Sequence, residues 1–158
     1  SVSGSLVFGI GTESNNSLGS ASIYSADDYG SFTTTYSGQT YASSFIDSGS
    51  NGYFFLEPGS AGAPPVCGDD SGFYCPTSTE NLSASNQGLN GTSGTVNFSV
   101  ANADTLFNNE TDNAFGDLGG PATDSAPTYF DWGLPFFFGR NVFVGLQSTT
   151  YTNGYWAY

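Results

Sequence analysis

The sequence has no histidine, no methionine and only one cationic side chain, Arg140, in 158 residues. Against this single cation stand 14 aspartate and glutamate residues, which give a formal net charge of -13 at pH 7. Proteins that bind nucleic acid or an anionic membrane surface neutralise phosphates with clustered lysine and arginine side chains. The near absence of cations therefore argues against nucleic acid and anionic lipid as partners.

The chain also lacks any apolar run long enough to span a membrane, so no membrane span is expected. Long helices are disfavoured, because lysine, arginine and methionine are scarce or absent whereas glycine occurs 22 times. Aromatic residues make up 16% of the chain and provide the buried area that a disordered composition lacks. The composition predicts an all-β fold of short antiparallel strands with one or two short helical turns.

Cysteine is limited to Cys67 and Cys75, eight positions apart. Zinc sites built on cysteine need further thiolate or imidazole ligands, and this chain offers neither, so no metal or cofactor is expected. We predict a disulfide that closes a surface loop. Paired cysteines and the scarcity of lysine point to an oxidising compartment, either extracellular or periplasmic. No secretory leader is recognisable, which favours a mature secreted piece or part of something longer.

The length fits one domain, which we expect to occupy residues 1–158. Within it, residues 57–90 are dominated by glycine, proline, serine and asparagine and are predicted to be a loop-rich insertion. Helical turns are expected within 104–117, capped by Asp104, and a hairpin within 147–158. Apolar runs and alternation predict strands at 6–10, 21–24, 31–36, 41–46, 53–56 and 94–100, and two more within 134–146, separated at Gly139.

One predicted strand ends in a carboxylate, at Asp47-Ser48-Gly49-Ser50. Aspartate, serine and glycine dominate ordinary turns, so the tetrapeptide is explained by a β-turn alone. It is also suited to presenting a carboxylate for chemistry, if Gly49 adopts a positive φ and the hydroxyls of Ser48 and Ser50 hold the side chain. Both interpretations are open on these four residues.

A second block, Phe-Phe-Phe-Gly-Arg-Asn-Val-Phe-Val at 136–144, follows about 90 residues later. In order and spacing the two blocks resemble one lobe of a pepsin-like aspartic peptidase. In such lobes an apolar strand ends in Asp-Thr/Ser-Gly-Thr/Ser, and a later apolar-apolar-Gly segment crosses beneath that loop. The whole chain also resembles the C-terminal half of a family of uncharacterised secreted bacterial proteins, whose preceding half carries a second such loop.

The resemblance implies that Asp47 is one of two catalytic carboxylates. It further implies that the Gly49 N–H and the Ser50 hydroxyl hold this carboxylate, and that Ser48 reaches toward the loop of a partner lobe. Gly139 would let the crossing strand pass close beneath the loop. Pepsins usually carry aspartate at the position of Arg140, so the sequence departs from their pattern there.

One lobe cannot complete this chemistry. Two adjacent carboxylates share a proton, so that one protonates the scissile carbonyl while the other activates water. The resemblance therefore implies a peptide substrate and a second lobe, supplied by the same precursor or by a homodimer, and an inactive isolated monomer. The alternative is a catalytically silent extracellular structural or binding module, including a subunit that self-assembles at a surface.

Three further alternatives stay open. The aromatic side chains of Tyr29, Tyr36, Tyr151 and Trp156 are suited to sugar binding, although aromatic strands more often pack in a core. Acidic clusters at 69–70 and 104–112 offer oxygen ligands for calcium. Arg140 is expected to form an ion pair or a carbonyl contact with a nearby aspartate such as Asp131, or else to grip a substrate or partner lobe.

Overall fold

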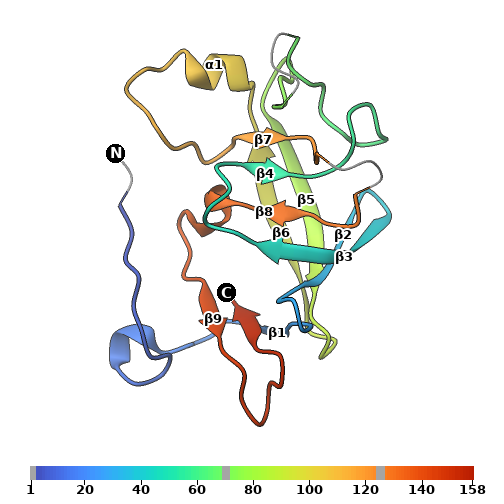
Figure 1. The fold of residues 1–158 in the computed structure, drawn as a ribbon. Helices are drawn as coiled ribbons and strands as arrows, with labels where there is room; N and C mark the ends of the chain where they lie inside the picture. Colours follow the sequence, from blue (N-terminus) through green and yellow to red (C-terminus); the bar gives the residue numbers. More distant parts are fainter. Residues whose placement is uncertain (1–2, 69–71, 124–126) are drawn as a thin grey trace.

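Two β-sheets and very little helix make up the computed structural model, which describes residues 3–68, 72–123 and 127–158 (Figure 1). The larger sheet has the strand order β6-β5-β2-β3-β8-β4-β7, and the smaller sheet has the order β1-β10-β9. This architecture confirms the all-β prediction. The elements are η1 (Ser14–Asn16), β1 (Ile23–Ser25), β2 (Phe32–Tyr36), β3 (Gln39–Ile46), β4 (Tyr53–Phe54), β5 (Glu80–Gln87), β6 (Ser93–Val100), α1 (Ala103–Phe107), β7 (Gly119–Gly120), β8 (Asp131–Trp132), η2 (Leu134–Phe137), β9 (Phe143–Gly145) and β10 (Tyr155–Ala157).

Two hairpins form one half of the larger sheet. Strands β2 and β3 are antiparallel and are joined at Ser37 and Gly38, whose φ values of 50° and 78° suit a tight hairpin turn. Strands β5 and β6 pair over their whole length, from Glu80 opposite Val100 to Gln87 opposite Ser93. As predicted for β6, Val96, Phe98 and Val100 are buried on one face.

The prediction of a loop-rich insertion at 57–90 is wrong in its second half, because β5 lies between β2 and β6 in the sheet. Its outward residues are polar, and only Leu82 and Ala84 on its inner face are apolar, so the alternation is faint in the sequence. Backbone pairing on both sides defines this strand more than hydrophobicity does. The preceding stretch has no named strand among its described residues but contains a single bridge between Val66 and Tyr74.

The N-terminal segment does not form the strand predicted at 6–10. Leu6 and Phe8 are 83% and 84% exposed, and the arm runs outside the body of the molecule before reaching β1 (Figure 1). An apolar run becomes a strand only when a neighbouring backbone is available to pair with it. The arm pairs with none of the described strands.

Aromatic rings fill the core between the larger sheet and the C-terminal segment. The rings of Phe55 and Phe130 are stacked with centroids 4.6 Å apart, and those of Phe130 and Trp132 with centroids 4.3 Å apart. Phe98 meets Phe130 edge to face. Such offset and edge contacts add stability beyond the area they bury. These rings fix the position of β8, since two of them belong to it or to the residue before it.

The phenylalanine run in the last third of the chain does not form the predicted first strand. Leu134–Phe137 is the 3-10 helix η2, and Pro135 at its start suits a helical first turn. Phe136 is fully buried and packs on Trp132, whereas Phe137 and Phe138 are half-buried. The second predicted strand is present as β9, which pairs with β10. The C-terminal hairpin therefore spans 143–157 and is not contained within 147–158 as predicted, since β10 is the one named strand in that range.

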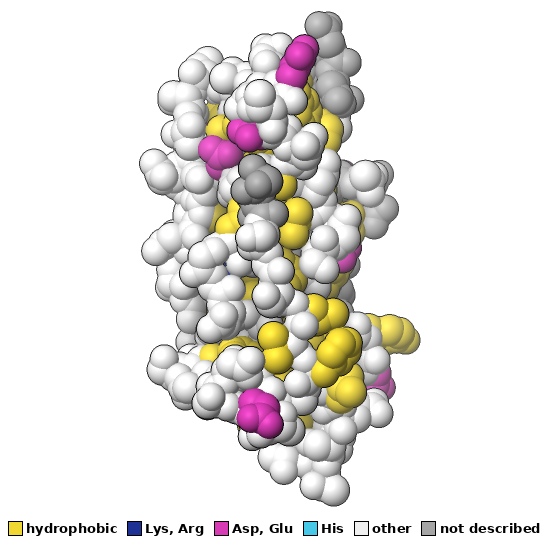
Figure 2. Space-filling model, turned by 90° about the vertical axis from the view of Figure 1, so that its left-hand side faces the viewer, with side chains coloured by type: hydrophobic (Ala, Val, Ile, Leu, Met, Phe, Trp, Pro, Cys, Tyr) yellow, Lys and Arg dark blue, Asp and Glu magenta, His cyan; other side chains and the backbone are white. Residues whose placement is uncertain are grey.

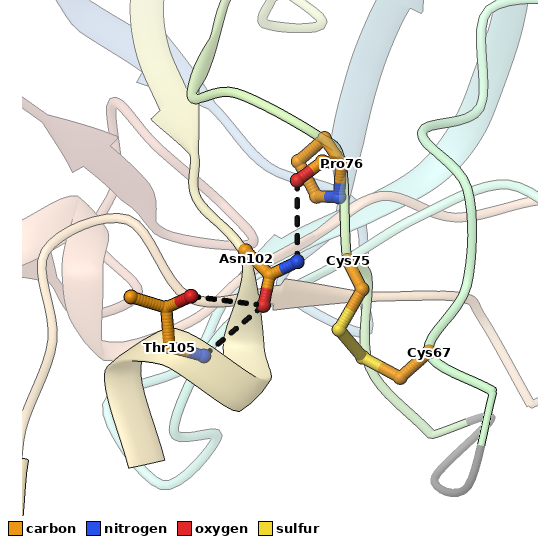
Figure 3. The surroundings of a disulfide bond; sticks show 5 residues. All are labelled: Cys67, Cys75, Pro76, Asn102 and Thr105. Atoms are coloured by element: carbon orange, nitrogen blue, oxygen red, sulfur yellow. Dashed lines mark hydrogen bonds between the residues drawn. A yellow bond between two sulfur atoms is a disulfide. The ribbon is translucent and has the colours of Figure 1, made fainter. Parts of the chain in front are cut away.

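The predicted disulfide between Cys67 and Cys75 is present (Figure 3). It lies beside α1, whose N-cap is Asn102 and not the predicted Asp104. The Asn102 side chain accepts a hydrogen bond from the Thr105 N–H and donates one to the Pro76 carbonyl, as Figure 3 shows. The cap thereby ties the helix to the chain that follows the disulfide.

Candidate functional site

Strand β8 lies between β3 and β4, the two strands that the 47–52 turn connects. It runs parallel to β3 and antiparallel to β4 (Figure 1). Two backbone hydrogen bonds join the turn to β8 and to the residues that follow it. The Asp47 N–H donates to the Trp132 carbonyl at 3.0 Å, and the Leu134 N–H donates to the Ser50 carbonyl at 2.7 Å. A segment from late in the chain therefore passes directly beneath the carboxylate-bearing turn.

The carboxylate of Asp47 is held by its own turn. Its Oδ1 accepts a hydrogen bond from the Gly49 N–H at 2.7 Å, and its Oδ2 contacts Ser50 Oγ at 3.0 Å. Both contacts are those that the resemblance implied, whereas the catalytic role of Asp47 stays a prediction. Asp47 is half-buried, and Ser48 and Gly49 are exposed. The turn thus presents the carboxylate at the surface in a fixed orientation.

The close crossing depends on Gly133 and not on Gly139. A Cβ at position 133 would lie 2.0 Å from the Gly52 carbonyl oxygen and 2.8 Å from that of Ser50. Gly139 has a φ of 75° and open space around it, so its predicted place beneath the loop is wrong. The prediction of a positive φ at Gly49 is also wrong, since Gly49 is not among the glycines with that conformation. A side chain there would instead crowd Asp47 Oδ1, at 3.0 Å.

A second carboxylate lies beneath the turn, at Asp131. Side chains alternate along a strand, so Asp131 points to the opposite face from Phe130 and Trp132, both of which are fully buried in the core. Its Oδ2 lies 2.6 Å from Ser50 Oγ. The hydroxyl of Ser50 therefore contacts one carboxylate from its own turn and one from β8.

The side chain of Asp131 is buried. The residue is 6% exposed, and its Oδ1 has no hydrogen-bond partner among the described residues. Burial raises the pKa of Asp131 from 3.8 to about 6, the hydrogen bond with Ser50 lowers it, and the charge of Asp47 raises it. The sequence analysis did not single out this residue for the site. The signal that could have found it is the pattern Phe-Asp-Trp-Gly, a lone carboxylate between two core aromatics and before a glycine.

The predicted ion pair between Arg140 and Asp131 is not formed. The guanidinium carbon of Arg140 lies 4.2 Å from the centroid of the Phe136 ring, and Asp131 makes its contact with Ser50. Arg140 also lines an open hollow of about 550 Å³ beside β5 and β6, together with Phe138 and polar residues such as Asn81. Its alternative role in gripping a substrate or a partner stays a prediction.

The aromatic residues considered for sugar binding do not form one surface. Tyr36 is buried in the core and its hydroxyl donates to the Gly62 carbonyl. Tyr29 is exposed in the turn that precedes β2. The Trp156 indole N–H donates to the Gly30 carbonyl, and the Tyr151 ring contacts Tyr155. Burial removes Tyr36 from any such surface, while Tyr151 and Trp156 are half-buried.

The acidic clusters provide no assembled cation site in the described part of the chain. Asp69 and Asp70 lie outside the described residues, so the structure does not address the first cluster. In the second, Asp112 accepts a hydrogen bond from the Asn109 side chain at 2.6 Å. The described group with potential metal ligands consists of Asp104 and the two cysteines, whose sulfur atoms are engaged in the disulfide.

Exposed apolar side chains gather on the side of the molecule that carries the N-terminal arm. Figure 2 shows this face, with hydrophobic side chains concentrated in its lower half. Leu6 and Phe8 of the arm and Val144 and Leu146 near the edge strand β9 are among the exposed large apolar residues. Among the residues that the structure describes, no helix is long and apolar enough to cross a membrane.

Comparison with known proteins gives one match. A family model described as "Protein of unknown function (DUF3443)" matches residues 1–158. Neither the curated proteins nor the solved structures contain a significant match to this chain.

Proposed function

The chain belongs to the DUF3443 family, proteins of unknown function, and we propose that it is one lobe of a secreted aspartic-peptidase-like protein that supplies Asp47 to a two-aspartate dyad. The observation that carries this proposal is the crossing of β8 beneath the 47–52 turn, with Asp47 held by Gly49 and Ser50. An isolated Asx-turn would explain the bond to Gly49. It would not require a strand from 80 residues later to lie between the two strands that flank the turn.

In the proposed reaction, Asp47 acts with an aspartate from a second lobe. One of the two carboxyl groups is protonated and polarises the scissile carbonyl, while the other accepts a proton from the attacking water. The Gly49 N–H and the Ser50 hydroxyl hold the Asp47 carboxyl group and fix its orientation. Ser48 is exposed beside Asp47, where it is available to the loop of the second lobe.

Asp131 is unsuited to be that second catalytic carboxylate. It is 6% exposed and is separated from Asp47 by the Ser50 hydroxyl, with which both carboxylates make contact. A substrate carbonyl would have to displace the turn to reach it. The dyad therefore needs a partner lobe, from the same precursor or from a second copy, and the isolated monomer is expected to be inactive.

The test compares this chain alone with the longer protein that the proposal requires, in which the chain is joined to a second lobe. Both are incubated with an unfolded protein substrate between about pH 3 and about pH 7, a range that brackets the ionisation of paired aspartates. Cleavage is expected from the longer protein, or from the chain alone with a rate that rises with the square of its concentration. Asp47→Asn should abolish the cleavage, and pepstatin should inhibit it.

The matched control is Asp27→Asn. The Asp27 carboxylate also accepts backbone hydrogen bonds within a turn, from Tyr29 and Ser31, but it lies in the β1–β2 connection. It should leave cleavage unchanged. Cleavage that survives Asp47→Asn contradicts the proposal. So does pepstatin-sensitive cleavage by a demonstrated monomer, or the absence of cleavage by every form of the protein.

A second candidate function is a non-catalytic module that assembles through its surface. The large exposed apolar side chains of the N-terminal arm and of the β9 region favour it, because such side chains are suited to a contact between copies. Light scattering of the chain should then show oligomers that Phe8→Ser and Leu146→Ser dissociate. A monomer at all concentrations, with or without these substitutions, would exclude this candidate for the isolated chain.

A further inference from the structure

Three side-chain oxygens form a row in which Asp47 and Ser50 belong to the 47–52 turn and Asp131 belongs to β8 beneath it. Asp131 Oδ2 lies 2.6 Å from Ser50 Oγ, which lies 3.0 Å from Asp47 Oδ2. Both separations are hydrogen-bond distances, and the shorter is typical of a hydroxyl bonded to a carboxyl group. The row therefore needs a hydrogen in each of its two contacts.

Ser50 cannot supply both hydrogens. A serine hydroxyl carries one hydrogen, and an ionised carboxylate only accepts. If Asp47 and Asp131 were both ionised, one contact would place two electron-rich oxygens together with no hydrogen between them. The second hydrogen must come from one of the two carboxyl groups.

Burial assigns that hydrogen to Asp131. Its Oδ1 is buried without a partner among the described residues, so an ionised Asp131 would leave a charged oxygen unsatisfied in a buried site. Asp47 is better suited to carry charge, because its Oδ1 accepts the Gly49 N–H and the side chain is half-buried. Desolvation and the charge of Asp47 raise the pKa of Asp131, in agreement with this assignment.

No described cation opposes this arrangement. The elements packed against β8 carry Asp47 from the turn, Tyr41 from β3 and Tyr53 from β4 as titratable groups. Burial raises the pKa of Tyr53 to about 12 and also raises that of Tyr41, so both are neutral near pH 7. Arg140 lies over the Phe136 ring and forms no ion pair with Asp131. Asp47 is thus the charge to which Asp131 is coupled.

We infer that Asp131 is a positioning residue that shares a proton with Asp47 through Ser50. The Asp131 carboxylic acid donates to Ser50 Oγ, and Ser50 donates its own hydrogen to Asp47 Oδ2. Ionisation of Asp131 removes one hydrogen from the row, so the Ser50 hydroxyl is then shared by two carboxylates and the turn loses one of its ties to β8. This inference rests on the proposed function only where it calls Asp47 catalytic, since the shared proton is a property of the chain by itself.

The test follows the aspartate side-chain carboxyl carbons of the isotopically labelled chain by NMR, between about pH 3 and about pH 8. The Asp131 signal is expected to change with a midpoint near 6, and the Asp47 signal to show a step at the same midpoint. Asp131→Asn should abolish that step in the Asp47 signal. Its amide resembles the protonated acid and can donate to Ser50 Oγ, so the turn is preserved. Asp27→Asn should leave both signals unchanged.

Ser50→Ala is the second variant. It removes the hydroxyl that links the two carboxyl groups, so it should reduce the step in the Asp47 signal at the Asp131 midpoint. An Asp131 signal that titrates near 3.8, the ordinary value, overturns the inference. So does an Asp47 signal without a step at the Asp131 midpoint. These measurements need no substrate, so their failure is distinct from a failure to find peptidase activity.

Discussion

Gly133 lies so close to Gly52 that a Cβ at position 133 would be 2.0 Å from the Gly52 carbonyl oxygen. This contact lets β8 pass beneath the 47–52 turn, and the Leu134 N–H then donates to the Ser50 carbonyl. The backbone of the turn and that of the crossing strand therefore form one unit. The site depends on this contact more than on any side chain of the turn.

We therefore expect Gly133→Ala to be severely destabilising. The added methyl group would meet backbone oxygens that cannot move without displacing the turn, so a loss of about 3 kcal/mol in the free energy of unfolding, or failure to fold, is expected. Urea denaturation provides the measurement. Gly139→Ala is the control: its side chain enters open space, and its cost should be about 1 kcal/mol from the φ of 75° alone. Equal losses for the two variants would contradict the crossing at Gly133.

The buried carboxyl of Asp131 should make folding stability depend on pH. Its pKa is raised by burial from 3.8 to about 6, so the folded state binds the proton more tightly than the unfolded state does. The stabilisation is complete below about pH 4 and is lost as pH rises through 6, with a loss of at most about 3 kcal/mol. Subtraction of the Asp131→Asn curve from that of the wild type isolates this contribution from those of the other acids. A difference that does not change between pH 4 and 7 would show that Asp131 ionises freely.

Replacement of the half-buried carboxylate of Asp47 should separate activity from stability. Asp47→Asn keeps the shape of the side chain, and its amide oxygen can still accept the hydrogen bond from Gly49. We expect a change within about 1 kcal/mol in unfolding free energy and a loss of at least about 100-fold in any peptidase rate of the complete protein. A comparable loss of rate in the Asp27→Asn control would point to a general effect of charge.

Arg140 is expected to be dispensable for folding. Its guanidinium contacts the face of the Phe136 ring, an interaction that contributes about 1 kcal/mol at a partly exposed position. Arg140→Met should therefore fold, with a loss of that size measured by thermal denaturation. Phe136→Ala, in contrast, removes a fully buried ring and should cost about 4 kcal/mol. Unfolding of the Arg140→Met chain would mean that the cation has a buried partner.

Reduction of the disulfide should lower stability without loss of the 47–52 turn. Cys67 and Cys75 close a short loop, which corresponds to about 2.5 kcal/mol in the chain-entropy model. A Cys67→Ala/Cys75→Ala variant should show this loss in urea, while the NMR signals of Asp47 and Asp131 keep their positions. Displacement of those signals would indicate that the loop supports the site directly.

Strands with clear alternation were predictable, and those defined by their neighbours were not. Val96, Phe98 and Val100 identify β6 from the sequence because one face of the strand is apolar. The residues of β5 are nearly all polar, and its place in the sheet comes from pairing with β2 and β6. The apolar segment at 6–10 shows the reverse case, since it is hydrophobic and yet pairs with no described strand.

The sequence by itself determined the all-β class, the disulfide and the turn that holds Asp47. Composition and cysteine count can be read without knowing the fold, and the hydrogen bonds of the turn join residues that are close in the sequence. The tertiary structure alone decided which later strand passes beneath that turn, and it selected Asp131-Trp132-Gly133 in place of the phenylalanine run at 136–138. The reason is steric and electrostatic: only a glycine fits under the Gly52 carbonyl, and the strand that brings Gly133 there also brings Asp131 to Ser50. Ser50 and Asp131, 81 positions apart, become neighbours through this packing, and no local sequence pattern predicts their contact.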